Sequence, residues 1–178
     1  MKKQKLLKIL AAALALSAVL FCFAACKDEQ APAETKNTKA QENTAGGVAF
    51  YVTVGQTRIE LGADAAPVIS ALGVPQSRQE IGDCAGLGAQ VRYNYPSVIL
   101  YTLISGNQET VDQITLRDDT VSTPAGIRIG STEAAVLSAY GEPTLRDDSS
   151  VQYISGALTL KFRLSEQKVS GIDLIRKS

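Results

Sequence analysis

Hydrophobic and polar residues alternate most clearly near the end of the chain, where residues 158–164 read L-T-L-K-F-R-L. Because successive side chains of a β-strand point to opposite faces, this pattern predicts a strand with one apolar and one polar face. The polar run 165–168 predicts a turn, residues 169–175 predict a returning strand, and residues 151–154 predict a strand before both. Together these segments predict an antiparallel meander.

A similar series occurs earlier in the chain. Residues 90–95, 98–104 and 110–116 are rich in branched and aromatic residues and predict three strands, with Ser-Gly-Asn at 105–107 as a turn. The strand 98–104 differs from 158–164 because apolar residues occupy both of its faces. Its outer face should therefore be covered, either by the first strand of the domain or by a partner. Further short strands are predicted at residues 57–61 and 127–129, and at 48–54 as an additional edge strand.

Two segments predict short helices and align with each other without a gap. Residues 61–75 (LGADAAPVISALGVP) and 129–143 (IGSTEAAVLSAYGEP) are identical at seven of fifteen positions. Asp64 and Thr132 are suited to accept hydrogen bonds from the first turn of each helix. A glycine, with a proline two residues later, then ends each helix. Helices of two turns are marginally stable alone, so each must pack on other elements.

These elements predict an α+β domain that is internally duplicated. Each of two tandem repeats, about 57–117 and 126–176, would contain a strand, a short helix and a three-stranded antiparallel meander. The two repeats would join their strands into one sheet, with both helices packed on one face. The opposite face of the sheet would be left for solvent or for a partner.

The N-terminal segment predicts export and lipidation. In residues 1–25, four lysines precede an uncharged apolar stretch, the order typical of a secretory signal peptide. The ending Phe-Ala-Ala before Cys26 resembles the lipobox at which lipoprotein signal peptidase cuts, which implies that Cys26 carries a lipid. The alternative is an uncleaved transmembrane anchor. Both interpretations place the domain on the extracytoplasmic face of a bacterial cell membrane.

Residues 26–47 form the predicted lipidated tether. From residue 27 to 47 the sequence has no aromatic and no branched aliphatic residue, so it cannot bury enough apolar surface to offset the entropy of ordering. We therefore expect a disordered tether followed by a globular domain at residues 48–178.

Composition and candidate chemistry argue against several classes of function. Removal of residues 1–25 takes away four lysines and no acidic residue, which leaves a formal charge of −4 and argues against nucleic-acid binding. The chain has no histidine, which excludes serine–histidine and cysteine–histidine nucleophiles. Two Leu-Arg-Asp-Asp segments, at 116–119 and 145–148, are interpreted as polar turns at strand ends rather than as a calcium or glycosidase site. No metal and no cofactor is expected.

Cys84 is the one cysteine that neither leaves with the signal peptide nor takes the lipid. A buried, inert thiol is the favoured interpretation, and a reactive thiol or an intermolecular disulfide is the alternative. The neighbouring residue is an acid, Asp83, which would disfavour the thiolate form.

The helix segments carry the motif G-x-(S/T/D)-x-x-x-V-hydrophobic-x-x-(Y/L)-G-x-P, present twice and followed each time by a tyrosine-containing meander. In this respect the chain resembles the tandem-repeat family of the beta-lactamase inhibitory protein and the related SmpA/OmlA/BamE-type assembly lipoproteins. The resemblance covers most of residues 57–176. It implies an exposed sheet that grips a partner protein, or a unit that contacts other envelope components. This chain lacks the tryptophan and the disulfide found in each half of the inhibitor.

The expected function is therefore a lipid-anchored, non-catalytic binding module that engages a protein or cell-wall component through its sheet face. An envelope assembly or maintenance factor within a larger complex is the alternative. Tyrosine and arginine are favoured where binding energy concentrates. The candidate partner-binding residues are Tyr93, Tyr95, Tyr101, Lys161 and Arg163.

Overall fold

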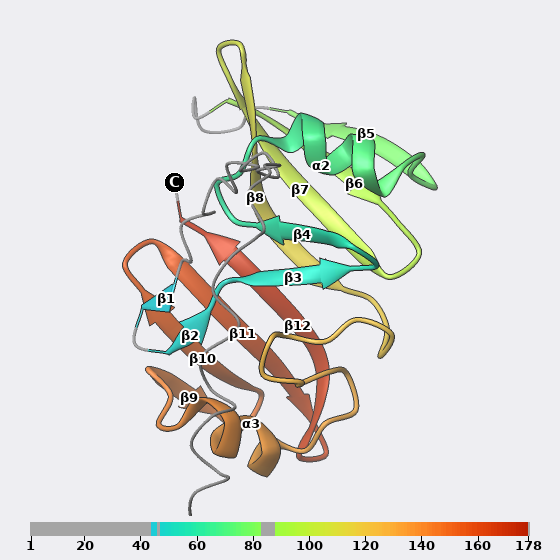
Figure 1. Ribbon diagram of the computed structural model, residues 1–178. Coiled ribbons are helices and arrows are strands. Elements are labelled where there is room, and N and C mark those ends of the chain that lie inside the picture. Colours follow the sequence, from blue (N-terminus) through green and yellow to red (C-terminus); the bar gives the residue numbers. More distant parts are fainter. Residues whose placement is uncertain (1–43, 46, 83–87, 178) are drawn as a thin grey trace, which may run out of the picture. The chain divides into compact units, whose positions relative to one another are not determined.

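The computed structural model describes residues 44–45, 47–82 and 88–177, which belong to the compact unit Ala40–Ser178. The fold is α+β, with an eight-stranded antiparallel sheet, two two-stranded sheets and two short helices (Figure 1). This confirms the predicted α+β class. The predicted signal peptide, the lipidation site Cys26, most of the tether and Cys84 lie outside the described residues.

The eight-stranded sheet is antiparallel throughout. Its two central strands, β8 and β12, come from the two halves of the chain and pair from Leu116 opposite Ile172 to Gln113 opposite Ile175. In spatial order the strands are β5 (Ser77–Ile81), β6 (Ala89–Asn94), β7 (Val98–Ser105), β8 (Gln108–Leu116), β12 (Lys168–Arg176), β11 (Leu158–Ser165), β10 (Ser150–Ser155) and β9 (Leu145–Asp147).

Each predicted meander has one more strand than the hydrophobic pattern indicated. The additional strands are β5 and β9, which form the two edges of the sheet. They were missed because all their side chains, apart from partly buried Ile81, are exposed, so no burial pattern marks them. Their backbones are nevertheless paired with β6 and β10. The segment 145–148, predicted as a polar turn at a strand end, consists of β9 up to Asp147 and a turn after it.

The two predicted helices are present with the predicted caps. α2 spans Ala65–Leu72 and α3 spans Glu133–Tyr140. The side chain of Asp64 accepts a hydrogen bond from the amide of Ala66 (3.0 Å), and that of Thr132 accepts one from the amide of Ala135 (3.2 Å). Glycines at 73 and 141, with φ of 78° and 76°, end the two helices in a conformation that residues with a Cβ rarely adopt.

The segment before α2 forms separate small sheets. β3 (Tyr51–Val54) pairs with β4 (Thr57–Glu60), and β1 (Thr44–Ala45) pairs with β2 (Val48–Ala49). The prediction that residues 48–54 add an edge strand to the main sheet is therefore wrong. Phe50, Val52 and Ile59 are fully buried in the core, and this burial rather than main-sheet pairing holds the segment.

The strand predicted at Ile127–Ile129 is also absent, although Ile127 is buried. Its backbone bonds locally instead. The amide of Thr123 donates to the carbonyl of Ile127 (2.8 Å), and the amide of Ile127 donates to Thr123 Oγ1 (3.2 Å). A loop that satisfies its own polar groups needs no partner strand.

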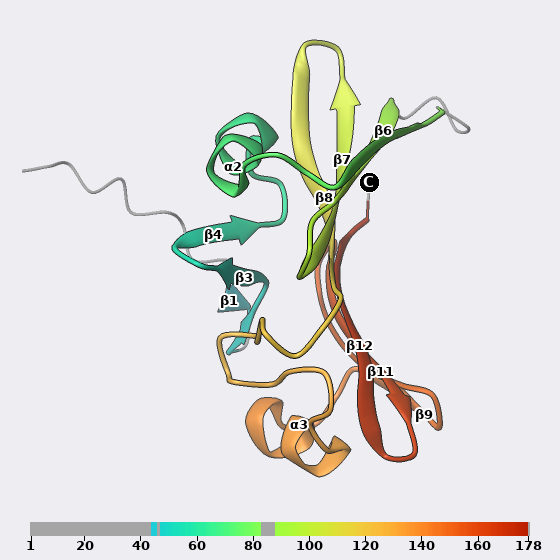
Figure 2. The ribbon, with the colours of Figure 1, turned by 90° about the vertical axis from the view of Figure 1, so that its right-hand side faces the viewer.

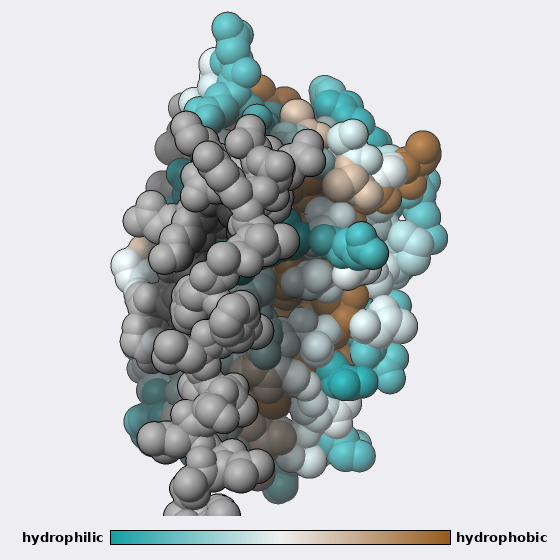
Figure 3. Space-filling view, in the orientation of Figure 1, coloured by the Kyte–Doolittle hydropathy of each residue, from teal (hydrophilic) through white to brown (hydrophobic). Residues whose placement is uncertain are grey.

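The hydrophobic core lies between the main sheet and a layer formed by α2, α3 and the β3–β4 pair, all on one side of the sheet (Figure 2). One row of buried side chains crosses six strands. In order it contains Tyr93, Leu100, Ile114, Leu174, Leu160 and Tyr153. Seen from the helix side, the exposed tip of the β7–β8 hairpin is hydrophilic (Figure 3).

Candidate functional site

The side of the main sheet that faces away from the helices is the candidate site, and we call it the open face. Its residues alternate along each strand with those of the buried row, because strand side chains point to opposite faces in turn. None of the described helices, nor β3 or β4, lies on this side (Figure 2). The open face comprises Arg92, Ile99, Tyr101, Gln113, Thr115, Gln152, Lys161, Arg163, Asp173 and Ile175.

The apolar outer side of β7 is not covered by the first strand of the domain. Ile99, Tyr101 and Leu103 belong to this side and are partly exposed. Strand β3 lies on the helix side instead, with Val52 in the core. From the sequence, two candidates could cover this side of β7, the first strand of the domain and a partner. The first strand is therefore excluded.

Three of the five predicted partner-binding residues lie on the open face. Tyr101, Lys161 and Arg163 come from β7 and β11, which lie on either side of the central pair β8–β12. Tyr101 and Lys161 are partly exposed and Arg163 is exposed. The structure thus brings together residues more than fifty positions apart in the sequence.

The placement of Tyr93 and Tyr95 on a binding surface is wrong, because they are only 5% and 3% exposed. Tyr93 points into the core opposite Leu100. Its hydroxyl donates to Glu109 Oε1 (2.9 Å) and accepts from Arg78 Nε (3.3 Å), so the polar end of the ring is satisfied inside the domain. Burial raises the pKa of both phenols above the ordinary value.

A chain of polar contacts crosses the centre of the open face, and the sequence analysis missed it. Gln113 Nε2 donates to Thr115 Oγ1 (3.1 Å), which donates to Asp173 Oδ1 (2.8 Å). Arg163 Nε forms an ion pair with Asp173 Oδ2 at 3.0 Å. This series of polar contacts therefore links β8, β12 and β11. Asp173 itself is 8% exposed, whereas Arg163 is exposed and Lys161 is partly exposed. The solvent-accessible charges at the centre of the open face are therefore positive.

A second feature of the open face is the pair Arg92–Tyr101. The guanidinium of Arg92 lies 5.8 Å from the centre of the Tyr101 ring, within the range of a cation–π contact. Arg92 Nε is buried without a hydrogen-bond partner in the described structure. Buried donors of this kind are costly unless something accepts from them.

Asp112 occupies the bulge between Tyr101 and Thr102 on the neighbouring strand, where Tyr101 faces Gln113 and Thr102 faces Val111. Burial raises the pKa of the Asp112 carboxyl, and the charge of Arg176 and a hydrogen bond from Gln90 partly offset this effect. Protonation of this acid is therefore easier than that of an exposed aspartate.

Gly171 allows the ion pair at the centre of the face. A Cβ at this position would fall on the guanidinium of Arg163, which lies across the glycine. We expect Gly171→Ala to displace Arg163 from Asp173 and to lower the free energy of unfolding by about 1 kcal/mol. Urea unfolding of a double-mutant cycle tests this. Arg163→Ala should cost stability in the wild-type background and nothing in Gly171→Ala, whereas equal costs in both would contradict the assignment.

Each of the two Leu-Arg-Asp-Asp segments runs from a strand into a local turn. Asp118 accepts from the amide and hydroxyl of Thr120 (3.0 and 2.5 Å), and Asp147 accepts in the same way from Ser149 (2.8 and 2.6 Å). These bonds hold the pKa of both carboxyls below the ordinary value. Each carboxylate thus stabilises its own turn.

Elsewhere in the described ranges, His, Cys, Asp and Glu side chains do not gather in groups of three or more that could hold a metal ion. No helix among these residues combines the length and the apolar character that a membrane crossing requires. Comparison of the chain with models of protein families, with curated proteins and with solved structures finds no match.

Proposed function

We propose that this protein is a lipid-anchored, extracytoplasmic, non-catalytic binding module, and that its open face engages a protein or another component of the cell envelope. The observation that carries the proposal is the open face itself. A broad side of an eight-stranded sheet is left uncovered by the described helices and small sheets (Figure 2). Lipidation of Cys26 rests on the sequence pattern alone.

The residue types on the open face suit a protein partner. Partly exposed Ile99, Tyr101 and Ile175 lie among polar side chains, and Tyr and Arg are enriched where binding energy concentrates. Their positions are also well fixed, because strand pairing holds the backbone and the Thr115–Asp173 contact joins the two central strands. A surface ordered in advance loses little entropy when it binds.

We also propose that the domain arose by duplication of one helix-plus-meander unit. Each half has a short helix followed by four strands, and the strand order β5-β6-β7-β8-β12-β11-β10-β9 reads the same outward from its centre. Both halves also have a bulge between the third and fourth strands of the meander, after Tyr101 and after Arg163.

Local contacts around the helices support the same proposal. The amide of Gly62 donates to the carbonyl of Val111 (2.7 Å), and the amide of Gly130 donates to the carbonyl of Val169 (2.7 Å). In return, Val111 and Val169 donate to the residues that follow these glycines (2.9 and 2.8 Å). Each helix is thus attached to the last strand of its own half by the same pair of bonds.

Under this proposal, Thr115 and Asp173 occupy equivalent positions at the centre of the sheet. Ile114 pairs with Leu174 and Leu116 pairs with Ile172, so exchanging the halves reproduces the pairing. The open face then consists of two related surfaces that have diverged in charge. The resemblance to the beta-lactamase inhibitory protein family stays a hypothesis based on the helix motif.

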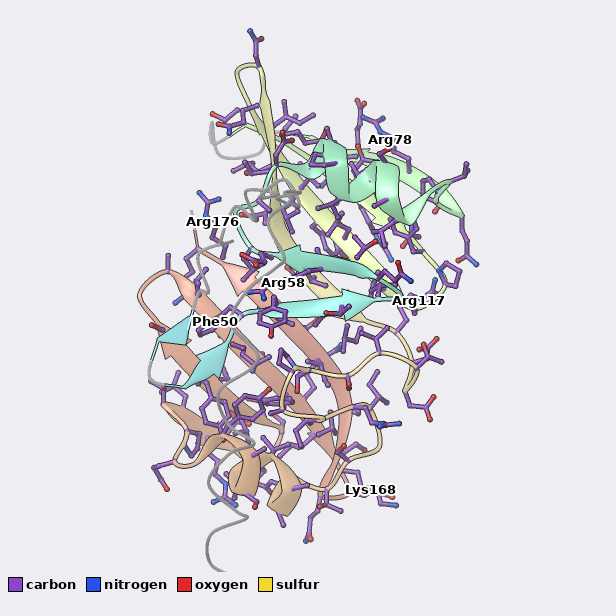
Figure 4. The ribbon with its side chains drawn as sticks, in the orientation of Figure 1. Phe50, Arg58, Arg78, Arg117, Lys168 and Arg176 are labelled. Atoms are coloured by element: carbon purple, nitrogen blue, oxygen red, sulfur yellow. The ribbon has the colours of Figure 1, made fainter. Side chains whose placement is uncertain are left out.

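The proposal predicts that Lys161→Glu weakens partner capture by about tenfold, because a central cation would be reversed. Lys168→Glu is the matched control, since it makes the same charge change at the exposed first residue of β12, next to the β11–β12 turn (Figure 4). The measurement is photo-crosslinking in intact cells, with a crosslinking amino acid at position 101 and identification of the products by mass spectrometry.

Equal losses in the two variants, or products at position 101 no different from those of a probe at position 168, would contradict the proposal. If the crosslinked partner belongs to a stable complex that survives detergent extraction, the protein acts there as an assembly or maintenance factor. If the captured partner stays a binary complex, the simple binding module is supported.

A further inference from the structure

The edge strand β5 offers a second surface, separate from the open face. Ser77, Arg78, Gln79 and Glu80 are exposed, and Ile81 is partly buried. One side of the strand pairs with β6 in an uninterrupted register from Ser77 opposite Asn94 to Ile81 opposite Gln90. No strand in the described part of the chain pairs with its other side. That side therefore presents backbone donors and acceptors that another strand can meet.

The two edges of the main sheet differ in their capacity to accept a strand. β9 has three residues, whereas β5 has five and contains no proline and no bulge. Short strands, prolines and bulges are the usual means by which proteins block edge pairing. On β5 only the charged side chains can restrict which strand pairs with its free side. The arrangement of those charges therefore determines which partner strand fits.

The charges on β5 are self-complementary. Arg78 and Glu80 lie on either side of Gln79, and because they are two positions apart they share one face of the sheet. Their side chains are 46% and 68% exposed, and they form an ion pair at 2.7 Å within one chain. An antiparallel two-fold axis through Gln79 would place each arginine opposite the glutamate of the other copy.

We propose that β5 pairs with β5 of a second copy of this chain, antiparallel and centred on Gln79, so that the two sheets become continuous. In this register Arg78 faces Glu80 of the second copy, and the reverse contact follows by symmetry. The interface is isologous, as in most two-fold dimers. It leaves both open faces available to partners.

Other registers are disfavoured by the same residues. An axis through residue 78 would place Arg78 opposite Arg78 of the second copy, and an axis through residue 80 would oppose two glutamates. Like charges directly opposite each other destabilise strand pairing, whereas opposite charges stabilise it. The register centred on Gln79 is therefore favoured for two reasons. Its opposed charges attract each other, and the registers centred on residues 78 and 80 bring like charges together.

Disulfide trapping tests this register. All variants are full chains with Cys22, Cys26 and Cys84 replaced by Ser. Directly opposed residues of antiparallel strands have Cα atoms about 5 Å apart, within disulfide range. Gln79→Cys should therefore form a disulfide dimer on mild oxidation. Ser77→Cys should not, because its two copies would lie about 13 Å apart along the strands. A mixture of Ser77→Cys and Ile81→Cys should form the heterodimer.

Exchange of the charges on β5 is the second test of this register. In the Gln79→Cys chain, Arg78→Glu should slow dimer formation by about tenfold, because both cross-strand pairs become repulsive. The double exchange Arg78→Glu with Glu80→Arg should restore the original rate. Arg78→Glu also removes the hydrogen bond to Tyr93, so its urea midpoint should fall. A cooperative urea transition above the urea-free assay conditions shows that each variant is folded when it is crosslinked. The proposal is overturned if Gln79→Cys crosslinks no faster than Ser77→Cys, if Arg78→Glu has no effect, or if the double exchange fails to restore the rate.

Discussion

Replacement of Phe162 by alanine should lower the free energy of unfolding by about 3–5 kcal/mol, one of the two largest effects that we expect in the domain. Phe162 is fully buried on β11 and packs against Tyr140 of α3. Its ring lies 5.4 Å from that of Tyr140 and 6.2 Å from that of Tyr153, the latter edge to face. Truncation removes these contacts and leaves a cavity that the paired strands cannot close.

Equilibrium unfolding in urea, followed by circular dichroism, measures this loss. Phe162→Leu keeps most of the volume and should cost much less, which gives a folded variant if alanine is not tolerated. Ser165→Ala on the same strand is exposed and should change stability by no more than about 0.5 kcal/mol. A loss at Phe162→Ala as small as that of Ser165→Ala would mean that the second half of the core is not packed as described.

Replacement of Phe50 by alanine should have an effect of similar size, about 3–5 kcal/mol, although Phe50 belongs to no strand. The residue is fully buried in the core cluster next to the start of β3. Its loss should therefore destabilise the whole domain rather than loosen its N-terminal edge. Urea unfolding should stay a single transition with a lowered midpoint.

Thr53→Ala is the control for this segment, because Thr53 is exposed although it directly follows buried Val52. It should leave stability nearly unchanged. If Phe50→Ala instead unfolded in two steps, or lost less than about 1 kcal/mol, the segment before α2 would be an appendage and not part of the core.

The helices and the inner strands could be predicted from the sequence because their signals are local. Asp64 and Thr132 cap the helices through their own side chains, and the glycines at 73 and 141 end them through backbone conformation. Residues 158–164 alternate because one face of β11 is buried and the other is not. Each of these features needs only neighbours within a few positions.

The open face could be predicted only in part. Periodicity identified Lys161 and Arg163 as the polar side of their strand, and the two apolar sides of residues 98–104 indicated an unusual surface. Periodicity did not show which side of the tyrosine-containing strand β6 is buried. Tyr93 and Tyr95 are core residues because they point in the same direction as Val91, and the hydroxyl of Tyr93 is satisfied by residues distant in the sequence.

By itself, the sequence determined the two helices, their ends, and the strands whose faces differ in polarity, since these depend on the intrinsic geometry of the chain. Tertiary structure alone decided that β5 and β9 are strands, that residues 48–54 enter the core on the helix side, and that Thr115 meets Asp173. Strand pairing and burial between distant segments create these features. Exposed edges and long-range polar contacts leave no periodic pattern in the sequence that could reveal them.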